Sequence, residues 1–308
     1  MTYQEVLEAA RTCSGPYCKA CPVCNGRACK NAVPGPGAKG SGTVAARNYD
    51  AWQNLSLNMD TICEGGAVDT GFTLFGQKYD LPVFAGPVGA VKMHYGDKLT
   101  DEEYNEILVP ACAKAGIAAF TGDGTNPTVF TAAAKAIGEN DGKGIPTVKP
   151  WDKETVFAKL DAAKASGAKV FAMDIDAAGL PFLKGLNPPA GPKTVEELKE
   201  IIDYAGVPFI IKGIMTVKGA LKALEAGAAG IVVSNHGGRV LDSVPATADV
   251  LPAIADAVIM ARPYVTAVYG GGEEGVKVLT AKIKAEMEDA MAMCGVHSLK
   301  EITREMLF

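Results

Sequence analysis

Residues 208–242, PFIIKGIMTVKGALKALEAGAAGIVVSNHGGRVLD, contain the repeating unit that decides the fold. Two apolar runs, FIIKG and GIVVSNH, enclose a segment whose apolar residues recur at helical spacing. That helix would carry its apolar residues on one face, namely Val217, Ala220, Leu221 and Leu224. Gly227 supplies the expected helix stop. The stretch therefore predicts a strand, a helix and a second strand parallel to the first.

The same alternation runs through most of the chain. Short apolar runs occur at 81–87, 116–122, 145–150, 168–176, 207–213, 230–236 and 256–263. Helix-like segments lie between them, for example at 101–116, 152–167, 194–206 and 216–227. No strand opens a Gly-x-Gly-x-x-Gly turn, so a closed barrel is favoured over an open dinucleotide-binding sheet. We predict an α/β fold of the TIM-type (β/α) barrel class, with seven strands where a complete barrel has eight.

Polar residues follow several of these strands at their carboxyl ends, which is the face where barrel enzymes place their chemistry. Lys212 ends one apolar strand, and a lysine there is a fixed cation at the mouth. His236 and Arg239 follow the next, which pairs a possible base with a cation suited to a carboxylate. Asp174 and Asp176 end another, and strand alternation predicts that only one of them faces the interior and orients the histidine.

Composition excludes several other classes of protein. The chain has 308 residues, is 48% hydrophobic and carries a net charge of -5 without a basic stripe, which disfavours nucleic-acid binding. No apolar run is long enough to span a bilayer, and no signal pattern opens the sequence. These features predict a cytoplasmic protein.

The strand-end residues carry a resemblance to a known family. The Ser-Asn-His-Gly-Gly-Arg string and its upstream Lys-Gly resemble the FMN-dependent α-hydroxy-acid oxidases and dehydrogenases, the group of lactate oxidase and glycolate oxidase. The similarity extends over about residues 45–305, through TLFGQKYDLPVFAGPVGA, ACAKAGIAAFTG and ARPYVTAVYGGGEEGV.

The resemblance implies oxidation of a small, lactate-like 2-hydroxy acid, with FMN lying across the barrel mouth and a homo-oligomeric assembly. His236 would take the hydroxyl proton, oriented by Asp176, while Arg239 holds the carboxylate and Lys212 stabilises reduced flavin. Further flavin contacts are implied at Ala85, Gly86, Pro87, Val88, Thr121 and Ser234, with Arg262 at the phosphate.

The chain departs from the family pattern in three places. The family's arginine after the strand-4 aspartate is missing, and Lys149 stands in the region where the family has Gln-x-Tyr. No Asp-Gly-Gly phosphate motif occurs, and ADVLPAIADAV runs directly into IMARP. The string ADAV, residues 255–258, would suit both the end of one helix and the start of the last strand, which predicts the deletion of one βα unit. We expect weakened FMN binding as a consequence.

Five of the eight cysteines lie in the first 29 residues, and PGPGAKGSG follows them. We therefore divide the chain into a cysteine-rich segment with its linker, 1–42, and a barrel domain, 43–308. Cys18, Cys21, Cys24 and Cys29, with Cys13 as a possible fifth ligand, have spacings compatible with zinc, with an iron-sulfur cluster or with unliganded thiols. An iron-sulfur cluster at these cysteines would indicate a protein partner that receives the electrons. The competing functions are a flavin-dependent isomerase of the type 2 isopentenyl diphosphate isomerase kind and a degenerate, non-catalytic barrel with a metal-binding segment.

Overall fold

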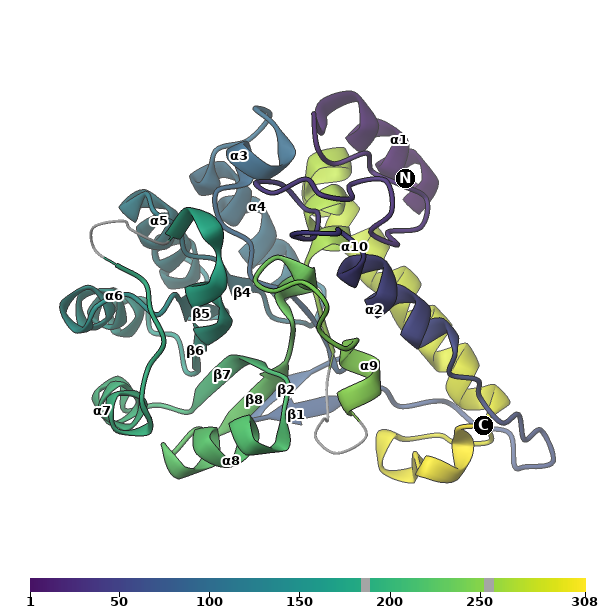
Figure 1. The fold of residues 1–308 in the computed structure, drawn as a ribbon. Coiled ribbons are helices and arrows are strands. Elements are labelled where there is room, and N and C mark those ends of the chain that lie inside the picture. Colours follow the sequence, from purple (N-terminus) through teal and green to yellow (C-terminus); the bar gives the residue numbers. More distant parts are fainter. Residues whose placement is uncertain (184–188, 252–257) are drawn as a thin grey trace.

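The computed structural model describes residues 1–183, 189–251 and 258–308 (Figure 1). The strands are β1 (Phe72–Leu74), β2 (Gln77–Tyr79), β3 (Val83–Ala85), β4 (Phe120–Thr121), β5 (Ile145–Val148), β6 (Phe171–Asp174), β7 (Phe209–Ile214), β8 (Gly230–Val233) and β9 (Val258–Met260). The α-helices are α1 (Tyr3–Cys13), α2 (Val44–Gln53), α3 (Val91–Tyr95), α4 (Asp101–Lys114), α5 (Pro127–Gly138), α6 (Lys153–Ala165), α7 (Val195–Ala205), α8 (Val217–Glu225), α9 (Thr247–Val250) and α10 (Arg262–Met293). Short 3-10 turns are η1 (Ile175–Gly179), η2 (Pro181–Leu183), η3 (His236–Gly238), η5 (Leu299–Glu301) and η6 (Arg304–Met306).

Seven parallel strands form the central wall of the described chain. The sheet β4-β5-β6-β7-β8 follows sequence order, and β3 pairs with β9. A bridge between Ala85 and Ala119 joins the two groups, which gives the order β9-β3-β4-β5-β6-β7-β8. Each of the seven predicted apolar runs contains one of these strands. In the described residues β8 and β9 are not paired, so the wall is α/β and parallel but is not a closed barrel.

Helices α4 to α8 surround the outside of the strands in Figure 1, as the alternating pattern predicts. Local signals set their ends. Thr100 and Thr194 each form a capping box with the glutamate three residues later, at the starts of α4 and α7. Gly206, with φ +69°, ends α7 in the left-handed conformation that glycine adopts without steric cost. The antiparallel hairpin β1–β2 lies below the wall, close to β8.

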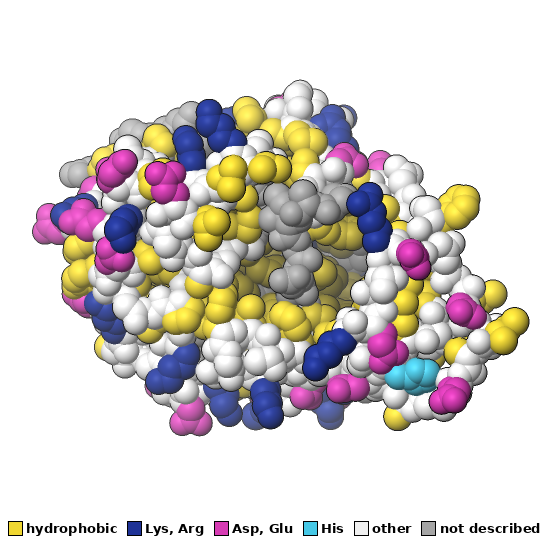
Figure 2. All heavy atoms as spheres, turned by 90° about the horizontal axis from the view of Figure 1, so that it is seen from below, with side chains coloured by type: hydrophobic (Ala, Val, Ile, Leu, Met, Phe, Trp, Pro, Cys, Tyr) yellow, Lys and Arg dark blue, Asp and Glu magenta, His cyan; other side chains and the backbone are white. Residues whose placement is uncertain are grey.

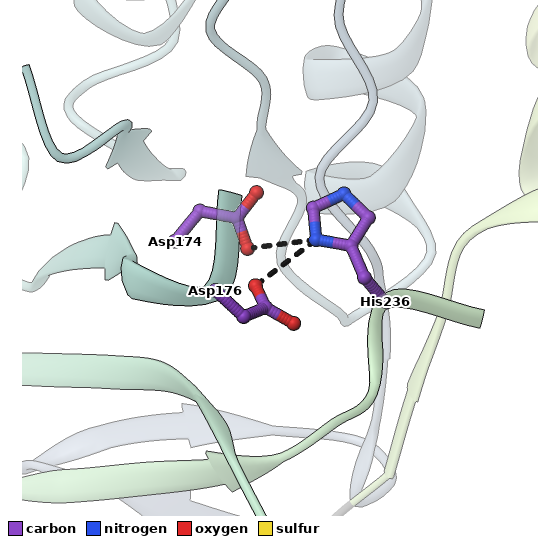
Figure 3. Close-up of side chains that lie close together, drawn as sticks. All are labelled: Asp174, Asp176 and His236. Carbon is purple, nitrogen blue, oxygen red and sulfur yellow. Dashed lines mark hydrogen bonds and ion pairs between the residues drawn. The ribbon is translucent and has the colours of Figure 1, made fainter. Parts of the chain in front are cut away.

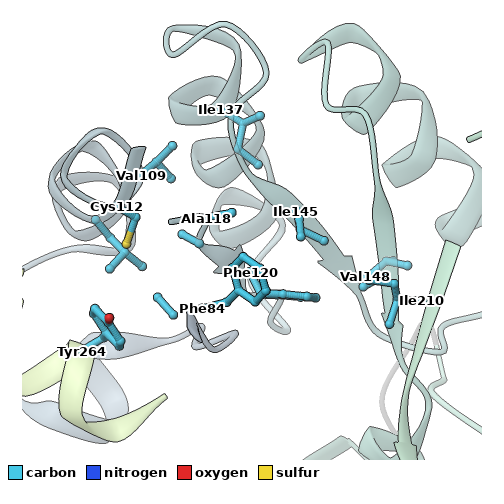
Figure 4. Packing of buried hydrophobic residues seen from close by; sticks show 14 of the residues in the cluster. Phe84, Val109, Cys112, Ala118, Phe120, Ile137, Ile145, Val148, Ile210 and Tyr264 are labelled. Atoms are coloured by element: carbon cyan, nitrogen blue, oxygen red, sulfur yellow. The ribbon is translucent and has the colours of Figure 1, made fainter. Parts of the chain in front are cut away.

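The main hydrophobic core lies between the strands and these helices. Phe84 of β3 and Phe120 of β4 are buried with ring centroids 6.2 Å apart, and Tyr264 of α10 and Cys112 of α4 lie in the same cluster (Figure 4). Burying aromatic side chains of this size is the largest apolar contribution to stability available to the fold.

The first 42 residues share that core. Helix α1 packs against α10, and Val6, Ala10 and Ala20 belong to the same buried cluster as the strands. No described helix combines the length and the apolar composition that a membrane crossing requires.

Helix α8 has the predicted apolar face, but no described element covers it. The pattern does place its apolar residues on one face, but Val217, Leu221 and Leu224 are 60%, 60% and 68% exposed. The physical reason lies in the wall. Strand β8 has no described neighbour on its far side, so the layer that would cover this face is not present among the described elements. Seen from below, apolar side chains gather around a hollow (Figure 2). The predicted junction at 255–258 lies outside the described residues except for Val258.

Candidate active site

The site forms where β6, β7 and β8 end. Asp174 is the last residue of β6 and pairs in register with Lys212 of β7. His236 begins η3, three residues after β8 ends. Because neighbouring parallel strands end at the same edge, three segments distant in sequence bring their polar side chains together there.

Both aspartates face His236, which corrects the expectation that only one would. His236 Nδ1 lies 3.0 Å from Asp176 Oδ1 and 3.6 Å from Asp174 Oδ1 (Figure 3). Alternation of side chains holds only within an extended strand. Here β6 ends at Asp174 and the chain enters the 3-10 turn η1, which turns Asp176 back to the same side.

Two backbone features make this approach possible. Gly213 has φ +106°, and a Cβ built on it would lie 2.5 Å from Asp176 Cγ, so any other residue would displace this carboxylate. His236 itself has φ +56°, an uncommon conformation for a residue with a side chain. Asn235, just before it, is fixed by paired hydrogen bonds of 2.8 Å with Asn48 of α2.

Lys212 is buried inside a network of charges. Its Nζ lies 2.5 Å from Asp174 Oδ1 and 3.6 Å from Asp176 Oδ1. Burial opposes the charged form, but the two carboxylates outweigh it and raise the pKa of Lys212. Lys149 Nζ adds a second cation, 3.5 Å from Asp174 Oδ2. Burial likewise opposes ionisation of Asp174, and His236, Lys212 and Lys149 together hold its pKa well below the ordinary value.

His236 is neutral near pH 7. Burial lowers its pKa, and Asp174 and Asp176 offset this only in part because Lys212 opposes them. With Nδ1 donating to Asp176, the lone pair of the neutral ring resides on Nε2. The arrangement is that of a general base held in one tautomer.

Arg239 supplies a buried cation whose charge is not neutralised by any described carboxylate. Its Nε has no hydrogen-bond partner among the described residues, and an Nη atom lies 3.4 Å from His94 Nε2. Burial, followed by the charges of Arg239, Lys149 and His236, lowers the pKa of His94 to about 3. Among the described residues, Lys149 and Lys212 pair with Asp174 and Asp176, and Arg239 pairs with no carboxylate. This local excess of positive charge suits an anionic ligand.

The residues implied for the flavin ring fit a planar, polar ligand at this edge. Thr121 Oγ1 at the end of β4 is buried without a partner in the described chain, as is Asp176 Oδ2. Ser234 Oγ accepts a hydrogen bond of 3.1 Å from the backbone N–H of His236. Residues 85–88 leave the end of β3, where Gly86 lies so close to β9 that an added Cβ would be 2.9 Å from Ile259. Buried polar atoms without partners are costly, so their presence indicates a ligand position.

A metal ion fits this edge less well. Asp174, Asp176 and His236 bring their ligand atoms within 4.8 Å of one another. The ammonium of Lys212 already lies against both carboxylates, so a second cation there would meet strong repulsion.

The cysteines predicted to bind metal are all free thiols. Cys18, Cys21, Cys24 and Cys29 line one small pocket together with Arg262, whereas Cys13 lies outside it and points its thiol to Tyr269 O. In the described chain no three cysteine sulfurs lie within 4.8 Å of one another.

Several residues of the site were not assigned a role from the sequence. Lys149 belongs to the site because its ammonium pairs with Asp174 on the neighbouring strand. Asp123 holds the end of β5 in place by accepting hydrogen bonds from Lys149 N and Trp151 Nε1. His94 is 4% exposed, although its sequence context equally suited a surface position. In the sequence, the one indication that Asp174 and Lys149 belong to the site is their position at the ends of predicted strands. Their ion pair joins two different strands and cannot be read from the sequence.

Comparison with known proteins shows which family the sequence matches and which solved structures share the fold. The family described as FMN-dependent dehydrogenase matches residues 35–182, 189–258 and 255–308. An L-lactate dehydrogenase of Bartonella tribocorum is 27% identical over 348 aligned positions, which cover 85% of this chain and 88% of that protein. An L-lactate dehydrogenase of Pseudomonas entomophila is 38% identical over 141 residues, 36% of this chain and 37% of that one. Among solved structures, a mandelate oxidase mutant with (S)-mandelic acid superposes with a TM-score of 0.76, covering 97% of this chain and 96% of that one at 20% identity.

Proposed function

The chain belongs to the FMN-dependent dehydrogenase family, and on this premise we propose that it oxidises a small 2-hydroxy acid to the 2-oxo acid with FMN as its cofactor. One observation carries the proposal. Arg239 is a buried guanidinium without a carboxylate partner in the described chain, and it lies in the same charge cluster as the neutral His236 that Asp176 orients.

Each residue has a distinct part in this chemistry. Arg239 binds the substrate carboxylate, because a planar guanidinium matches two carboxylate oxygens. His236 Nε2 accepts the proton of the substrate hydroxyl, and Asp176 stabilises the imidazolium that results. His94, with its lowered pKa, stays neutral beside Arg239 and does not compete for the carboxylate.

FMN supplies the hydride acceptor when it is bound. The backbone of residues 85–88, Thr121 and Ser234 would contact its ring, and Arg262, just after β9, would contact its phosphate. Lys212 would face the ring as a cation. Asp174 already neutralises much of that charge, so this chain would stabilise an anionic ring less than an unpaired lysine would.

The gap between β8 and β9 supports the deletion of one βα unit. The alignment with the Bartonella relative has more positions than this chain has residues, so that relative carries segments that this chain lacks. The family model matches residues 189–258 and 255–308, and both matches include the ADAV string at 255–258. The same four residues therefore fit the family sequence before the deleted unit and after it. A unit lost at this point would take with it part of the phosphate site.

The test uses protein loaded with FMN and a series of 2-hydroxy acids that begins with L-lactate. We expect anaerobic bleaching of the flavin absorbance by at least one acid. His236→Gln should lower kcat by about 10²–10⁴, the usual contribution of a general base. Arg239→Met should mainly raise KM, with partial recovery in Arg239→Lys.

His297→Gln is the matched control, since His297 lies far from this edge near the C-terminus and should leave the rate unchanged. The proposal is wrong if FMN binds and no hydroxy acid bleaches it, or if His236→Gln reacts as fast as the parent.

A further inference from the structure

The part of the cysteine-rich segment between α1 and α2 has no regular secondary structure, and its buried residues are small. From Ser14 to Thr43 it contains no helix or strand. Its buried positions are small or rigid residues, namely Ala20, Gly26, Gly35, Pro36, Gly37, Ala38 and Gly42. Its larger apolar side chains, Tyr17 and Val23, are exposed. Loops of this length without secondary structure are uncommon and are usually functional, and small cores need a disulfide or a metal in addition.

The five cysteines of this segment separate into two groups. Cys18, Cys21, Cys24 and Cys29 line one pocket, where each thiol is free. Cys13 ends α1 and donates from Sγ to the carbonyl oxygen of Tyr269 on α10, at 3.3 Å. The structure therefore selects four candidate ligands and excludes the fifth.

The guanidinium of Arg262 adds a cation to the lining of the pocket. Arg262 lines it and donates to Pro36 O at 3.4 Å. A thiolate-bound metal centre carries net negative charge, which a buried guanidinium at this position would offset.

We propose that Cys18, Cys21, Cys24 and Cys29 bind one four-iron, four-sulfide cluster beside Arg262. The spacing along the chain, Cys-x2-Cys-x2-Cys, is that of ferredoxin clusters, whereas structural zinc sites more often use separated pairs of cysteines.

The placement of the sulfur atoms is compatible with this assignment. Four sulfurs around zinc at about 2.3 Å would lie about 3.8 Å apart. Here the four thiols surround a pocket, and no three cysteine sulfurs in the described chain lie within 4.8 Å of one another. In a four-iron cluster each cysteine sulfur binds a different iron, so the four sulfurs stand around the cluster and need not lie within 4.8 Å of one another.

The test is the metal content of the full chain, purified without oxygen and reconstituted with ferrous iron and sulfide. We expect about four iron and four acid-labile sulfide per chain, with an electron paramagnetic resonance signal after reduction by dithionite. Cys21→Ser should lose most of the iron, while Cys13→Ser, the matched control, should keep it.

Stoichiometric zinc without iron would overturn the proposal, as would four thiols that react with a thiol reagent in protein that takes up no metal. Equal loss of iron in Cys13→Ser and Cys21→Ser would contradict the assignment of ligands. Because these measurements require neither FMN nor substrate, their outcome is independent of the proposed oxidation.

Discussion

At the scale of single residues, His94 connects the site to the pH dependence of stability. It is buried, its Nδ1 has no partner in the described chain, and its pKa in the folded protein is about 3, far below the value of about 6.5 expected when unfolded. The unfolded chain therefore binds a proton at this residue more tightly. The stability that His94 contributes is full above about pH 6.5 and is lost as the pH falls toward the folded pKa.

We predict that acidification from pH 7 to pH 5 costs about 2 kcal/mol of folding free energy through His94. His94→Gln should remove that part of the loss, as measured by urea unfolding at the two pH values. The matched control, His297→Gln, changes a histidine that is not fully buried and should leave the loss as in the parent. An equal loss in His94→Gln and the parent would show that His94 is accessible to protons in the folded state.

Asp174 is the second residue whose burial has a measurable consequence. It contacts two buried ammonium groups, of Lys212 and Lys149, and its removal leaves Lys149 without a described partner. Breaking a buried ion pair from one side is costly because a charge stays behind.

We predict that Asp174→Asn lowers the free energy of unfolding by about 3–5 kcal/mol. Asp203→Asn, which breaks an exposed pair with Lys199, should change it by less than about 1 kcal/mol. Chemical denaturation of both variants measures the difference. Similar, small losses in the two variants would mean that Lys149 and Lys212 reach solvent when Asp174 is absent.

At the scale of elements, α8 shows that a correct helical pattern does not by itself determine burial. Its apolar face follows from residue spacing, but burial requires a neighbouring layer, and none of the described elements covers Val217, Leu221 and Leu224. At the end of β6 the residue pattern predicts the wrong arrangement of two side chains. Spacing predicts that the side chains of Asp174 and Asp176 diverge, and the 3-10 turn η1 brings them together.

We predict that Leu221→Lys changes the free energy of unfolding by less than about 0.5 kcal/mol, the usual range for surface positions. Ile201→Ala, at a buried position of the neighbouring helix α7, should cost about 2–5 kcal/mol. Thermal and urea unfolding give both values. A loss above 2 kcal/mol for Leu221→Lys would mean that the α8 face is covered in solution.

At the scale of the whole molecule, the open side of the wall affects the phosphate end of the flavin site more than the ring end. The residues proposed to contact the ring lie on or directly after β3, β4, β7 and β8, which are all described, whereas the phosphate would rest on the β8–β9 side. Arg262, the described cation on that side, also lines the cysteine pocket.

We therefore predict that FMN and riboflavin bind with dissociation constants within about tenfold of each other, equivalent to about 1.4 kcal/mol. Quenching of flavin fluorescence measures both. Arg262→Gln should abolish the remaining preference for FMN and leave riboflavin binding unchanged. A thousandfold preference for FMN would instead require a phosphate site as complete as that of a full barrel.

Much of this protein follows from its sequence. The alternation of apolar runs and helical patterns locates all seven parallel strands, because burial on both faces makes such strands continuously apolar. The Lys-Gly and Ser-Asn-His-Gly-Gly-Arg strings place Lys212 and His236 at the same edge, since parallel strands share the orientation of their carboxyl ends. The spacing of the four cysteines likewise predicts a set of metal ligands.

Only the tertiary structure decides how these groups act on one another. It brings Asp174 and Asp176 to one imidazole, adds Lys149 and His94 to the site, separates Cys13 from the other cysteines and leaves one face of α8 exposed. The reason is physical: strand and helix periodicity depends on near neighbours in the chain, whereas pKa values, ion pairs and burial depend on atoms brought close by packing.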